Sequence, residues 1–277
     1  MVQRLQRHLW PVGSTEDWNI SSIEILRQNK KYLPEEEIDD LVGKDLCRIQ
    51  RHGKKMLFDL GDDGFEAHNS MSGYWDVAED PWTFDYVEGA RQVVDSDVRV
   101  RIRLQSRSLE SPSRTATLRF HDSRLFGYIR RNEELLVEQT PEIMVTDESI
   151  LKLPPVSALK MMNECHRRWR SRDKLTVRDM LLDQKIVLGI VNIYAAEGLW
   201  RASVHPSTLA HGLDGDAWEN ILGGVRSAMA DALLYDLRYD GYLRVYRRER
   251  CLLGHKILCE KVRGRSSYFC GECQKKK

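Results

Sequence analysis

The sequence lacks any apolar run of the roughly 18 residues that a membrane-spanning helix needs, and this excludes an ordinary transmembrane protein. Residues 1–10 are too polar and too basic for a secretory signal peptide. There is no internal repeat, and no low-complexity tract precedes the terminal lysines, so a repeat array is excluded as well. We therefore expect a folded, cytoplasmic protein that works inside the cell and has no membrane partner.

A surplus of charge of one sign is also missing, because 43 lysines and arginines face 42 acidic residues and leave a net charge of +1. The charges are nevertheless spread unevenly. Acidic residues gather in segments 34–40 and 61–66, whereas segments 99–131, 165–174 and 243–277 are strongly basic. Each run taken alone is most simply a solvated surface, but the basic runs could together hold a polyanion although the whole molecule is nearly neutral.

With 277 residues, of which 42% are hydrophobic, the chain is long enough for two modest domains. From residue 23 to about residue 131, short segments alternate between apolar and polar residues and end at turn residues, which predicts strands. Segment 98–104, for example, should place its apolar side chains on one face and its arginines on the other. This half is predicted to be a β-sandwich.

Helical spacing replaces this alternation after about residue 132. Thr176 is a plausible cap for a helix over 177–182, and segment 218–234 forms a longer amphipathic stretch. Segment 138–155 contains Thr-Pro and Leu-Pro-Pro and is typical of a linker. We expect an α+β fold with a β-sandwich domain at 1–135, a linker at 136–155, a helical domain at 156–245 and a metal-binding hairpin at 246–277.

Cysteine is scarce, with six residues, but four of them fall within the last 27 residues. This crowding indicates a metal site rather than disulfides. Cys251 and His255 form one close pair, Cys270 and Cys273 form another, and fourteen residues separate the two pairs. Two such pairs on a hairpin supply the four ligands of a tetrahedral Zn²⁺ ion. One structural ion would contribute folding free energy to a tail too short for its own core.

Cys259 is an alternative to His255 as the second ligand. We favour His255 because it lies nearer to Cys251 and leaves a longer, strand-like arm. The connector between the pairs places Arg265 at the hairpin tip, where it could enter a groove or clamp a phosphate. Cys47 and Cys165 stand singly in the sequence and are predicted to be buried free thiols.

Segment 264–274, Gly-Arg-Ser-Ser-Tyr-Phe-Cys-Gly-Glu-Cys-Gln, resembles the C-terminal end of the formamidopyrimidine-DNA glycosylase and endonuclease VIII family. The resemblance covers nearly the whole chain from residue 23 onward. Segment 181–195 is similar to the family's helix-two-turn-helix signature, although Val191 stands where the family usually has a glycine. Segments 52–54, 68–73 and 121–127 resemble motifs of the family's sheet domain in the same order. The resemblance implies a helix-two-turn-helix domain followed by a zinc finger.

The resemblance also implies roles for single residues. Asn192 would hold a DNA phosphate, and Lys54 would grip DNA near the lesion. The residues that fill the gap left by a flipped-out nucleotide would be Met71, Arg124 and Phe126. An apolar wedge and an aromatic ring replace lost stacking, and a guanidinium pairs with the edge of the orphaned base. Taken singly, each of these residues is an ordinary core or surface residue, but their joint occurrence favours DNA binding.

The family's chemistry begins at an N-terminal proline followed by glutamate, and this sequence has neither there. Removal of Met1 would expose Val2, whose α-amine, with a pKa of about 7.7–8, is roughly one-tenth unprotonated at pH 7 and so able to act as a nucleophile. Gln3 and Gln6 stand where the family has carboxylates, and an amide cannot transfer the required proton. In a second alignment, residues 2–9 match the later part of the family's first helix, and the catalytic end is missing.

The resemblance implies a base-excision DNA glycosylase with AP lyase activity, which forms a Schiff base through an N-terminal amine. We expect a monomer that is associated with double-stranded DNA carrying damaged bases or abasic sites. The alternative is a catalytically impaired relative that only binds lesions, as Gln3 and Gln6 suggest. A third interpretation, an unrelated zinc-finger protein with protein partners, requires the motif matches to be accidental. Recognition of the damaged base is expected in a mobile loop around residues 212–224.

Overall fold

The computed structural model describes residues 1–11, 17–70, 73–79, 95–107, 114–132, 156–169, 175–234 and 239–275. The chain separates into two compact units. The N-terminal unit comprises residues 1–85, 89–138 and 146–151, and the C-terminal unit comprises residues 86–88, 139–145 and 152–277. Each unit has its own hydrophobic core, and each is described by itself.

The chain begins with helix α1 (Val2–Leu9). Val2, Leu5 and Leu9 recur at spacings of three and four residues, which places them on one helical face. All three side chains are buried in the core of the N-terminal unit. The indole nitrogen of Trp18 donates a hydrogen bond of 2.8 Å to the Leu9 carbonyl, so a carbonyl at the helix end is satisfied. Helix α1 therefore rests on the sheets through its apolar face.

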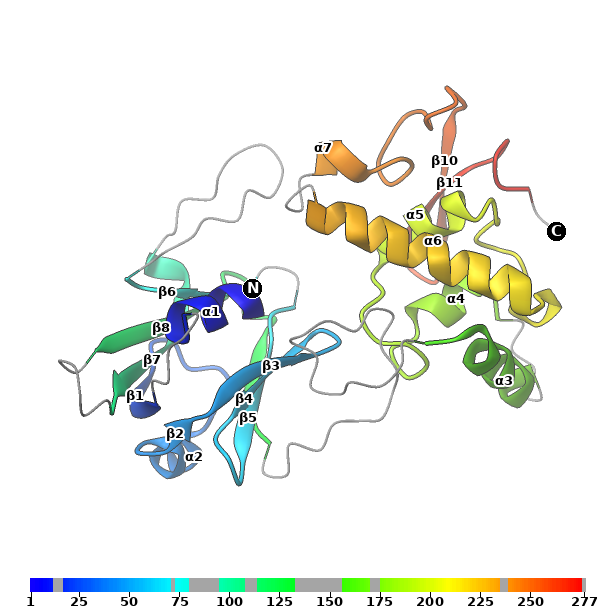
Figure 1. Ribbon diagram of the computed structural model, residues 1–277. Coiled ribbons are helices and arrows are strands. Elements are labelled where there is room, and N and C mark those ends of the chain that lie inside the picture. Colours follow the sequence, from blue (N-terminus) through cyan, green and yellow to red (C-terminus); the bar gives the residue numbers. More distant parts are fainter. Residues whose placement is uncertain are drawn as a thin grey trace. The chain divides into compact units, whose positions relative to one another are not determined.

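The described part of the N-terminal unit contains two antiparallel sheets (Figure 1). The first has the strand order β2-β1-β7-β8-β6, and the second has the order β3-β4-β5-β9. Helix α2 (Glu35–Leu41) and the 3-10 turn η1 (Asp95–Asp97) connect strands. The strands are β1 (Trp18–Ile25), β2 (Asp45–Leu46), β3 (Arg48–His52), β4 (Lys55–Asp59), β5 (Gly64–His68), β6 (Tyr74–Val77), β7 (Val98–Ser106), β8 (Thr115–His121) and β9 (Tyr128–Arg131).

Aromatic side chains from both sheets form a common core. The ring of Phe58 in β4 lies 5.0 Å from that of Trp75 in β6 and 4.4 Å from that of Phe65 in β5. The Trp75 ring lies 5.1 Å from Phe120 in β8. All four side chains are buried, and full burial of a side chain such as phenylalanine contributes about 1.5–3 kcal/mol. The prediction of a β-sandwich is confirmed.

Strand β7 shows the predicted alternation with one exception. Arg101 and Arg103 lie on the outer face, where both pair with Glu24 of β1 at 3.9 and 2.6 Å. Arg99 is buried instead, because the register of β7 and β8 shifts between residues 98 and 100. The basic run 99–131 is therefore not an uninterrupted cationic surface. Carboxylates of the same unit also pair with Arg107, Arg119, Arg130 and Arg131.

The C-terminal unit is helical apart from one hairpin and isolated bridges among its described residues. Its longest helix, α6, runs beside α5 (Figure 1). The elements are α3 (Ala158–Trp169), α4 (Val177–Leu182), α5 (Asn192–Arg201), the 3-10 turn η2 (Ala210–Gly212), α6 (Gly215–Leu234), α7 (Tyr239–Tyr242), β10 (Ile257–Val262) and β11 (Arg265–Cys270).

Helix α4 begins where its sequence predicts. The Thr176 hydroxyl accepts a hydrogen bond of 3.2 Å from the Asp179 amide. The Asp179 carboxylate in turn accepts one of 3.1 Å from the Thr176 amide. This reciprocal pair satisfies two amide donors of the first turn, and the predicted cap is confirmed.

Helices α5 and α6 pack closely through glycines. A Cβ atom on Gly198 would lie 2.3 Å from a Val225 methyl group, and one on Gly224 would lie 2.6 Å from the Gly198 carbonyl oxygen. The prediction of a mobile loop around residues 212–224 is wrong, because residues 210–212 form η2 and α6 begins at Gly215. Gly224, at the end of the predicted loop, instead permits the close approach of α5 to α6, and Trp218 is buried in the core of the unit.

The predicted domain boundaries remain predictions, because the expected linker at 136–155 lies outside the described residues. Cys165 is buried as expected, whereas Cys47 is exposed, so the prediction for Cys47 is wrong. Cys47 stands between β2 and β3, each at an edge of its sheet, where few neighbours cover it. In the part of the chain that the structure describes, no helix is both long and apolar enough to cross a membrane.

Candidate functional site

Three of the predicted DNA-contacting segments meet at one edge of the second sheet, where β4 begins, β5 ends and β9 begins. Lys55, the first residue of β4, lies opposite His68, the last residue of β5. His68 in turn lies opposite Tyr128, the first residue of β9. The turn before β4, the segment after β5 and the loop before β9 therefore share this edge. The turn carries Lys54, which is exposed, and the loop carries Arg124 and Phe126.

The loop that joins β8 to β9, residues 122–127, presents an aromatic ring beside a cation. The Phe126 side chain is 51% exposed, which is unusual for so large an apolar group and leaves the ring free to stack on a ligand. The Arg124 guanidinium lies 5.2 Å from the centre of this ring, and the Lys31 ammonium lies 5.9 Å from it. The loop therefore offers an apolar face and hydrogen-bond donors at one place.

The segment after β5 forms a tight turn. The Ser70 amide donates a hydrogen bond of 3.0 Å to Nδ1 of His68, and Ser70 has a left-handed backbone with φ of 55°. Burial and two neighbouring lysine charges lower the pKa of His68, so its imidazole stays neutral near pH 7 and Nδ1 can accept. Met71 follows directly but lies outside the described residues, and its role as an apolar wedge stays a prediction.

The N-terminal end of the chain is packed against the sandwich. The Met1 sulfur accepts a hydrogen bond of 3.1 Å from the side-chain Nδ2 of Asn69. Val2 is 6% exposed within the core, and its nitrogen is a peptide amide while Met1 is attached. Gln6 donates through its side chain to a carbonyl of β3 at 2.6 Å. The Gln3 side chain lies outside the described part of the structure. Val2 as a nucleophile therefore stays a prediction that depends on removal of Met1.

In the C-terminal unit, Asn192 links three elements. Its Nδ2 donates a hydrogen bond of 2.7 Å to the Ser266 carbonyl of β11, and its Oδ1 accepts one of 2.8 Å from the Arg178 guanidinium of α4. Arg178 is buried, and its burial together with the nearby Arg265 charge lowers its pKa. Two cationic side chains thus lie near the N-terminus of α5. The helix dipole and its open amides favour an anion at such a position.

Val191, which stands where the family usually has a glycine, does not strain the backbone. Val191 is the cap residue of α5 and has an extended conformation, with φ of −114° and ψ of 168°. Any residue adopts this conformation. Gly189, two residues earlier, has φ of 95° and is the position in this turn where glycine is needed. Asn192 is not the cap of α5, since it is the first helical residue and its side-chain amide donates to the Ser266 carbonyl instead.

A buried carboxylate on α5 fixes the segment that leads to the hairpin. Glu197 has no exposed surface. One of its oxygens accepts hydrogen bonds from the Val245 and Tyr246 amides at 2.9 and 2.8 Å. The other oxygen accepts from the Arg244 amide at 2.9 Å. Three charge-assisted hydrogen bonds offset the cost of burying this charge.

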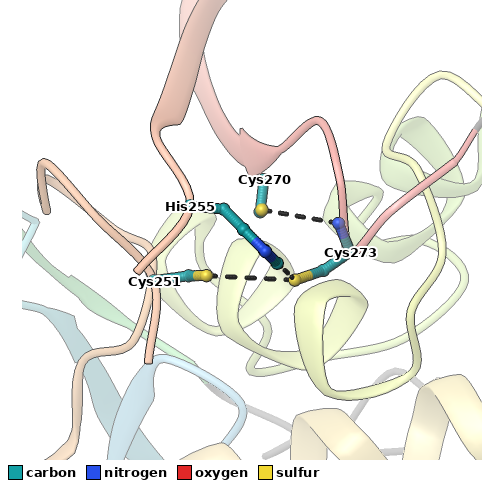
Figure 2. Close-up of side chains that lie close together, drawn as sticks. All are labelled: Cys251, His255, Cys270 and Cys273. Carbon is teal, nitrogen blue, oxygen red and sulfur yellow. Dashed lines mark hydrogen bonds between the residues drawn. The ribbon is translucent and has the colours of Figure 1, made fainter. Parts of the chain in front are cut away.

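Four side chains at the base of the β10–β11 hairpin form a cluster that could hold a metal ion (Figure 2). The ligand atoms of Cys251, His255, Cys270 and Cys273 all lie within 4.8 Å of one another. The Cys251 and Cys273 sulfur atoms are 3.9 Å apart, and Nδ1 of His255 lies 3.3 Å from the Cys273 sulfur. The turn after Cys251 closes with a hydrogen bond of 2.9 Å from the Cys251 amide to the His255 carbonyl.

The spacing of these atoms fits a tetrahedral ion. Metal–sulfur bonds of about 2.3 Å in a tetrahedron place two sulfur atoms roughly 3.8 Å apart, close to the observed 3.9 Å. Burial and the adjacent thiols raise the pKa of Cys273 to about 12, and a bound cation would offset this by favouring the thiolate of Cys273. Cys259 is exposed on β10 and lies outside the cluster. The structure thus brings together the four residues that we favoured.

Sequence reasoning missed the residues that support these side chains. Arg178 reads as an exposed charge in a short amphipathic helix, and only the fold shows that it contacts Asn192. Asp122 belongs to the segment 121–127 that resembles a family motif, but that resemblance does not show that its side chain is buried. Glu197 could have been found, because a single carboxylate among the apolar residues of α5 indicates a buried acceptor.

Comparisons with known proteins agree with this architecture. Residues 2–129 match the formamidopyrimidine-DNA glycosylase N-terminal domain, and residues 154–238 match the formamidopyrimidine-DNA glycosylase H2TH domain. The formamidopyrimidine-DNA glycosylase of an Exiguobacterium species is 26% identical, with 99% of this chain and 98% of that protein aligned. The enzyme of the same name from Syntrophotalea carbinolica is 35% identical, over 57% of this chain and 62% of that protein.

Solved structures show the same fold. The Lactococcus lactis formamidopyrimidine-DNA glycosylase, bound non-covalently to DNA with an AP site, matches with a TM-score of 0.72 and 23% identity. The alignment covers 99% of this chain and 98% of that one. A structure of MutM in complex with DNA containing carbocyclic 8-oxo-G matches with a TM-score of 0.73 and 23% identity, over 99% and 97% of the two chains.

Proposed function

Because the chain belongs to the formamidopyrimidine-DNA glycosylase family, we propose that it is a DNA repair enzyme that binds damaged double-stranded DNA, flips out the lesion and releases the damaged base. Relatives carry the name of this glycosylase, and similar structures contain it on DNA with an abasic site or a Fapy-dG lesion. The observation that carries the proposal is the shared sheet edge, where the turn with Lys54 and the loop with Arg124 and Phe126 emerge together.

The roles at this edge follow from the chemistry of the side chains. The half-exposed ring of Phe126 stacks against the bases that border the gap, and Arg124 donates to the edge of the orphaned base. Met71 is proposed as the apolar wedge. Lys54, Asn192 and Arg265 bind phosphates, which position the duplex but carry little sequence information.

We propose an amine at the N-terminus as the nucleophile, namely Val2 after removal of Met1. Its lone pair forms a bond to C1′ of the sugar while the glycosidic bond breaks and the base leaves with the bonding electrons. Ring opening then gives a Schiff base, and loss of a proton from C2′ expels the 3′ phosphate by β-elimination. Gln3 cannot transfer the protons of these steps, so a catalytic acid is not assigned.

Trapping with borohydride tests this chemistry. Reduction of the Schiff base on a duplex with an abasic site should give a covalent adduct, and mass spectrometry should locate it on the N-terminal peptide. The Lys54→Ala variant is the control, because Lys54 is a second primary amine at the same edge of the sheet. An adduct that persists in this variant excludes Lys54, and its location on the N-terminal peptide assigns the reaction to the N-terminal amine.

A protein that binds lesion DNA but gives neither an adduct nor strand cleavage would instead be a binding relative without lyase activity. Measurement of strand nicking and of affinity on the same abasic-site duplex separates the two functions. Loss of lesion binding itself would contradict the proposal as a whole.

We further propose that the ion in the cluster is Zn²⁺. Three cysteine sulfurs and one imidazole nitrogen are the donors that Zn²⁺ prefers in structural sites. The four side chains complete a tetrahedral set without an open position, which suits a structural role rather than Lewis-acid catalysis. The ion joins the two ends of the β10–β11 hairpin and thereby stabilises the arm that carries Arg265.

A further inference from the structure

The 122–127 loop, which carries Arg124 and Phe126, is closed by a buried carboxylate. Asp122 has no exposed surface. Its Oδ2 accepts a hydrogen bond of 2.7 Å from the Gly127 amide, at the far end of the loop. The same oxygen accepts one of 3.2 Å from the hydroxyl of Tyr32. One carboxylate oxygen therefore ties both ends of the loop to the segment between β1 and α2.

The backbone of Asp122 is held as firmly as its side chain. Its carbonyl accepts hydrogen bonds of 3.0 Å from the buried Arg99 guanidinium and 3.2 Å from the Leu125 amide. Its amide donates to the Asp97 carbonyl at 3.0 Å. Gly127 has no room for a side chain, because an added Cβ would lie 2.7 Å from Phe120 and 3.1 Å from Oδ2 of Asp122. The close approach of Gly127 to the carboxylate is therefore built into the loop.

The segment that contains Tyr32 also supports the loop tip. The Lys31 ammonium donates to the Leu125 carbonyl at 3.3 Å, and the Ile129 amide donates to the Lys31 carbonyl at 2.8 Å. Leu125 has a left-handed backbone with φ of 56°. An L-residue keeps such a conformation only where its surroundings impose it, and these contacts supply that constraint.

Resting on the proposed function, we propose that Asp122 and Tyr32 are positioning residues, which hold the 122–127 loop in the shape that presents Arg124 and Phe126 to the gap in the duplex. Neither residue touches the DNA in this role. Tyr32 acts through Asp122, and Asp122 acts through the Gly127 amide. The hydrogen bonds from Tyr32 and Gly127 to Asp122, here called the clamp, order the loop before DNA binds. The loop therefore loses less conformational entropy on binding.

The Tyr32 hydroxyl is suited to this task because it keeps its proton. Burial, the Asp122 charge and the hydrogen bond to Asp122 all raise the pKa of Tyr32 above its ordinary value. The hydroxyl therefore keeps its proton near neutral pH and donates it to the Asp122 carboxylate. The ring itself packs edge-on against Phe120 at 6.0 Å, so phenylalanine can replace tyrosine without loss of this packing.

Hydrogen exchange in the free protein tests the clamp without DNA. The Tyr32→Phe variant removes one hydroxyl, and we expect the Gly127 amide to exchange roughly tenfold faster than in the wild type. Tyr128→Phe is the matched control, because the Tyr128 hydroxyl also donates to a buried carboxylate, but to that of Glu66 in β5 at 3.1 Å rather than to Asp122. The Gly127 amide should exchange at the wild-type rate in this control.

A DNA measurement then tests the role. The readout is the ratio of affinities for abasic-site duplexes that carry different bases opposite the site, with Arg124→Ala as the reference for a lost contact. We expect Tyr32→Phe to reduce this ratio, by up to roughly tenfold, while its thermal midpoint and its affinity for undamaged duplex stay close to wild type. Asp122→Asn keeps an acceptor oxygen for the Gly127 amide and should lose less preference than Asp122→Ala.

The outcomes separate the two proposals. A wild-type protein without any preference for abasic-site duplexes overturns the proposed function and the inference with it. The inference alone is overturned if Tyr32→Phe leaves the preference for the base opposite the abasic site at its wild-type value. It is also overturned if the Gly127 amide exchanges at the same rate in Tyr32→Phe and Tyr128→Phe. Should Asp122→Ala fail to fold, Tyr32→Phe and Asp122→Asn still decide the result.

Discussion

Three turns near the candidate DNA-contacting residues contain a non-glycine residue with a left-handed backbone. Ser70 precedes Met71, Leu125 lies between Arg124 and Phe126, and Arg263 lies two residues before Arg265. The φ angles of Ser70, Leu125 and Arg263 are 55°, 56° and 48°. Such a backbone costs an L-residue about 1–2 kcal/mol, and residues with this cost gather at binding sites where the fold compensates for it.

Ser70→Gly should therefore stabilise the protein. Glycine adopts φ near 55° without a steric penalty, and the hydrogen bond from the residue-70 amide to His68 is kept. We expect a gain of about 0.5–1 kcal/mol in the free energy of unfolding by urea. Ser21→Gly is the control, because Ser21 is exposed in β1; glycine there should cost about 0.5–1 kcal/mol and also removes the hydrogen bond from the Ser21 hydroxyl to the Arg103 carbonyl. Equal effects of the two substitutions would contradict strain at Ser70.

Among single residues, the sequence predicted those that would bind a ligand directly, such as the metal ligands. It did not predict those that only hold another residue in place. Cysteine spacing identified the cluster because four ligands must lie close together on a short hairpin. Tyr32 and Asp122 stand 90 positions apart and meet only through tertiary packing. No spacing rule connects such a pair.

The β10–β11 hairpin, taken as an element, depends on the metal cluster at its base. His255→Ala removes one of the clustered ligands, so we expect less than one Zn²⁺ per chain by elemental analysis and a lower thermal midpoint. Cys259→Ala is the matched control on the same hairpin, because Cys259 is exposed opposite Tyr268 and lies outside the cluster. One full ion should remain in this variant. Loss of zinc from Cys259→Ala with retention in His255→Ala would reverse the ligand assignment.

Strands β6 and β8 are joined by a buried polar cluster. Asp76 has no exposed surface, and it accepts hydrogen bonds from Arg119 at 2.7 and 2.8 Å and from His121 at 3.1 Å. Burial alone would raise the pKa of Asp76, but the hydrogen bonds and charges of His121 and Arg119 outweigh burial and lower it below the ordinary value of 3.8. The contribution of Asp76 to stability is thus present above pH 3.8 and is lost as the pH falls through the lower, folded-state pKa.

Asp76→Asn should remove that contribution. We expect a loss of about 3–5 kcal/mol at pH 7, since the Arg119 guanidinium loses its buried carboxylate partner and keeps only the exposed Asp95, and a shallower decline of stability below pH 3.8. Asp45→Asn is the control, because Asp45 pairs with Arg107 at the surface, and an exposed pair contributes at most about 1 kcal/mol. Urea unfolding at a series of pH values measures both. A steep acid decline retained in Asp76→Asn would assign the pH dependence to other carboxylates.

Element boundaries were predictable where local chemistry sets them. The capping box at Thr176 and the alternation of β7 are visible in the sequence because they depend on neighbouring residues alone. The first half of α6 was not, because a mobile loop was expected around residues 212–224, whereas Gly224 serves a close contact with α5 rather than a turn. Glycine has the same sequence signal in both settings.

For the whole molecule, the distribution of charge decides the strength and salt dependence of DNA binding. Each phosphate contact that is lost should reduce the slope of log affinity against log salt by about 0.9. We expect this reduction for Lys54→Ala and for Arg265→Ala, both exposed cations. Arg103→Ala is the control, because this exposed arginine pairs with Glu24 on the outer face of the first sheet. Fluorescence anisotropy at several salt concentrations measures the slopes.

An equal change of slope in Arg103→Ala would mean that the basic run 99–131 binds DNA as a whole rather than through selected side chains. The paired state of its arginines argues against this. The uneven distribution of charge along the sequence could predict a polyanion as the partner, but it could not distinguish cations engaged within the fold from those left for a ligand.

Helix α5 contacts the β10–β11 hairpin region at two places, through Asn192 at the tip and through Glu197 at the segment that leads into the base. Removal of the ion by a chelator should therefore loosen only the segments that carry Cys251, His255, Cys270 and Cys273. The hydrogen bonds of Asn192 and Glu197 need no cation and still hold the β10–β11 hairpin region against α5. We accordingly expect the helices of the metal-depleted protein to stay folded and only the base of the β10–β11 hairpin to lose its order. Readdition of the ion should restore the hairpin quickly, without refolding of the helices.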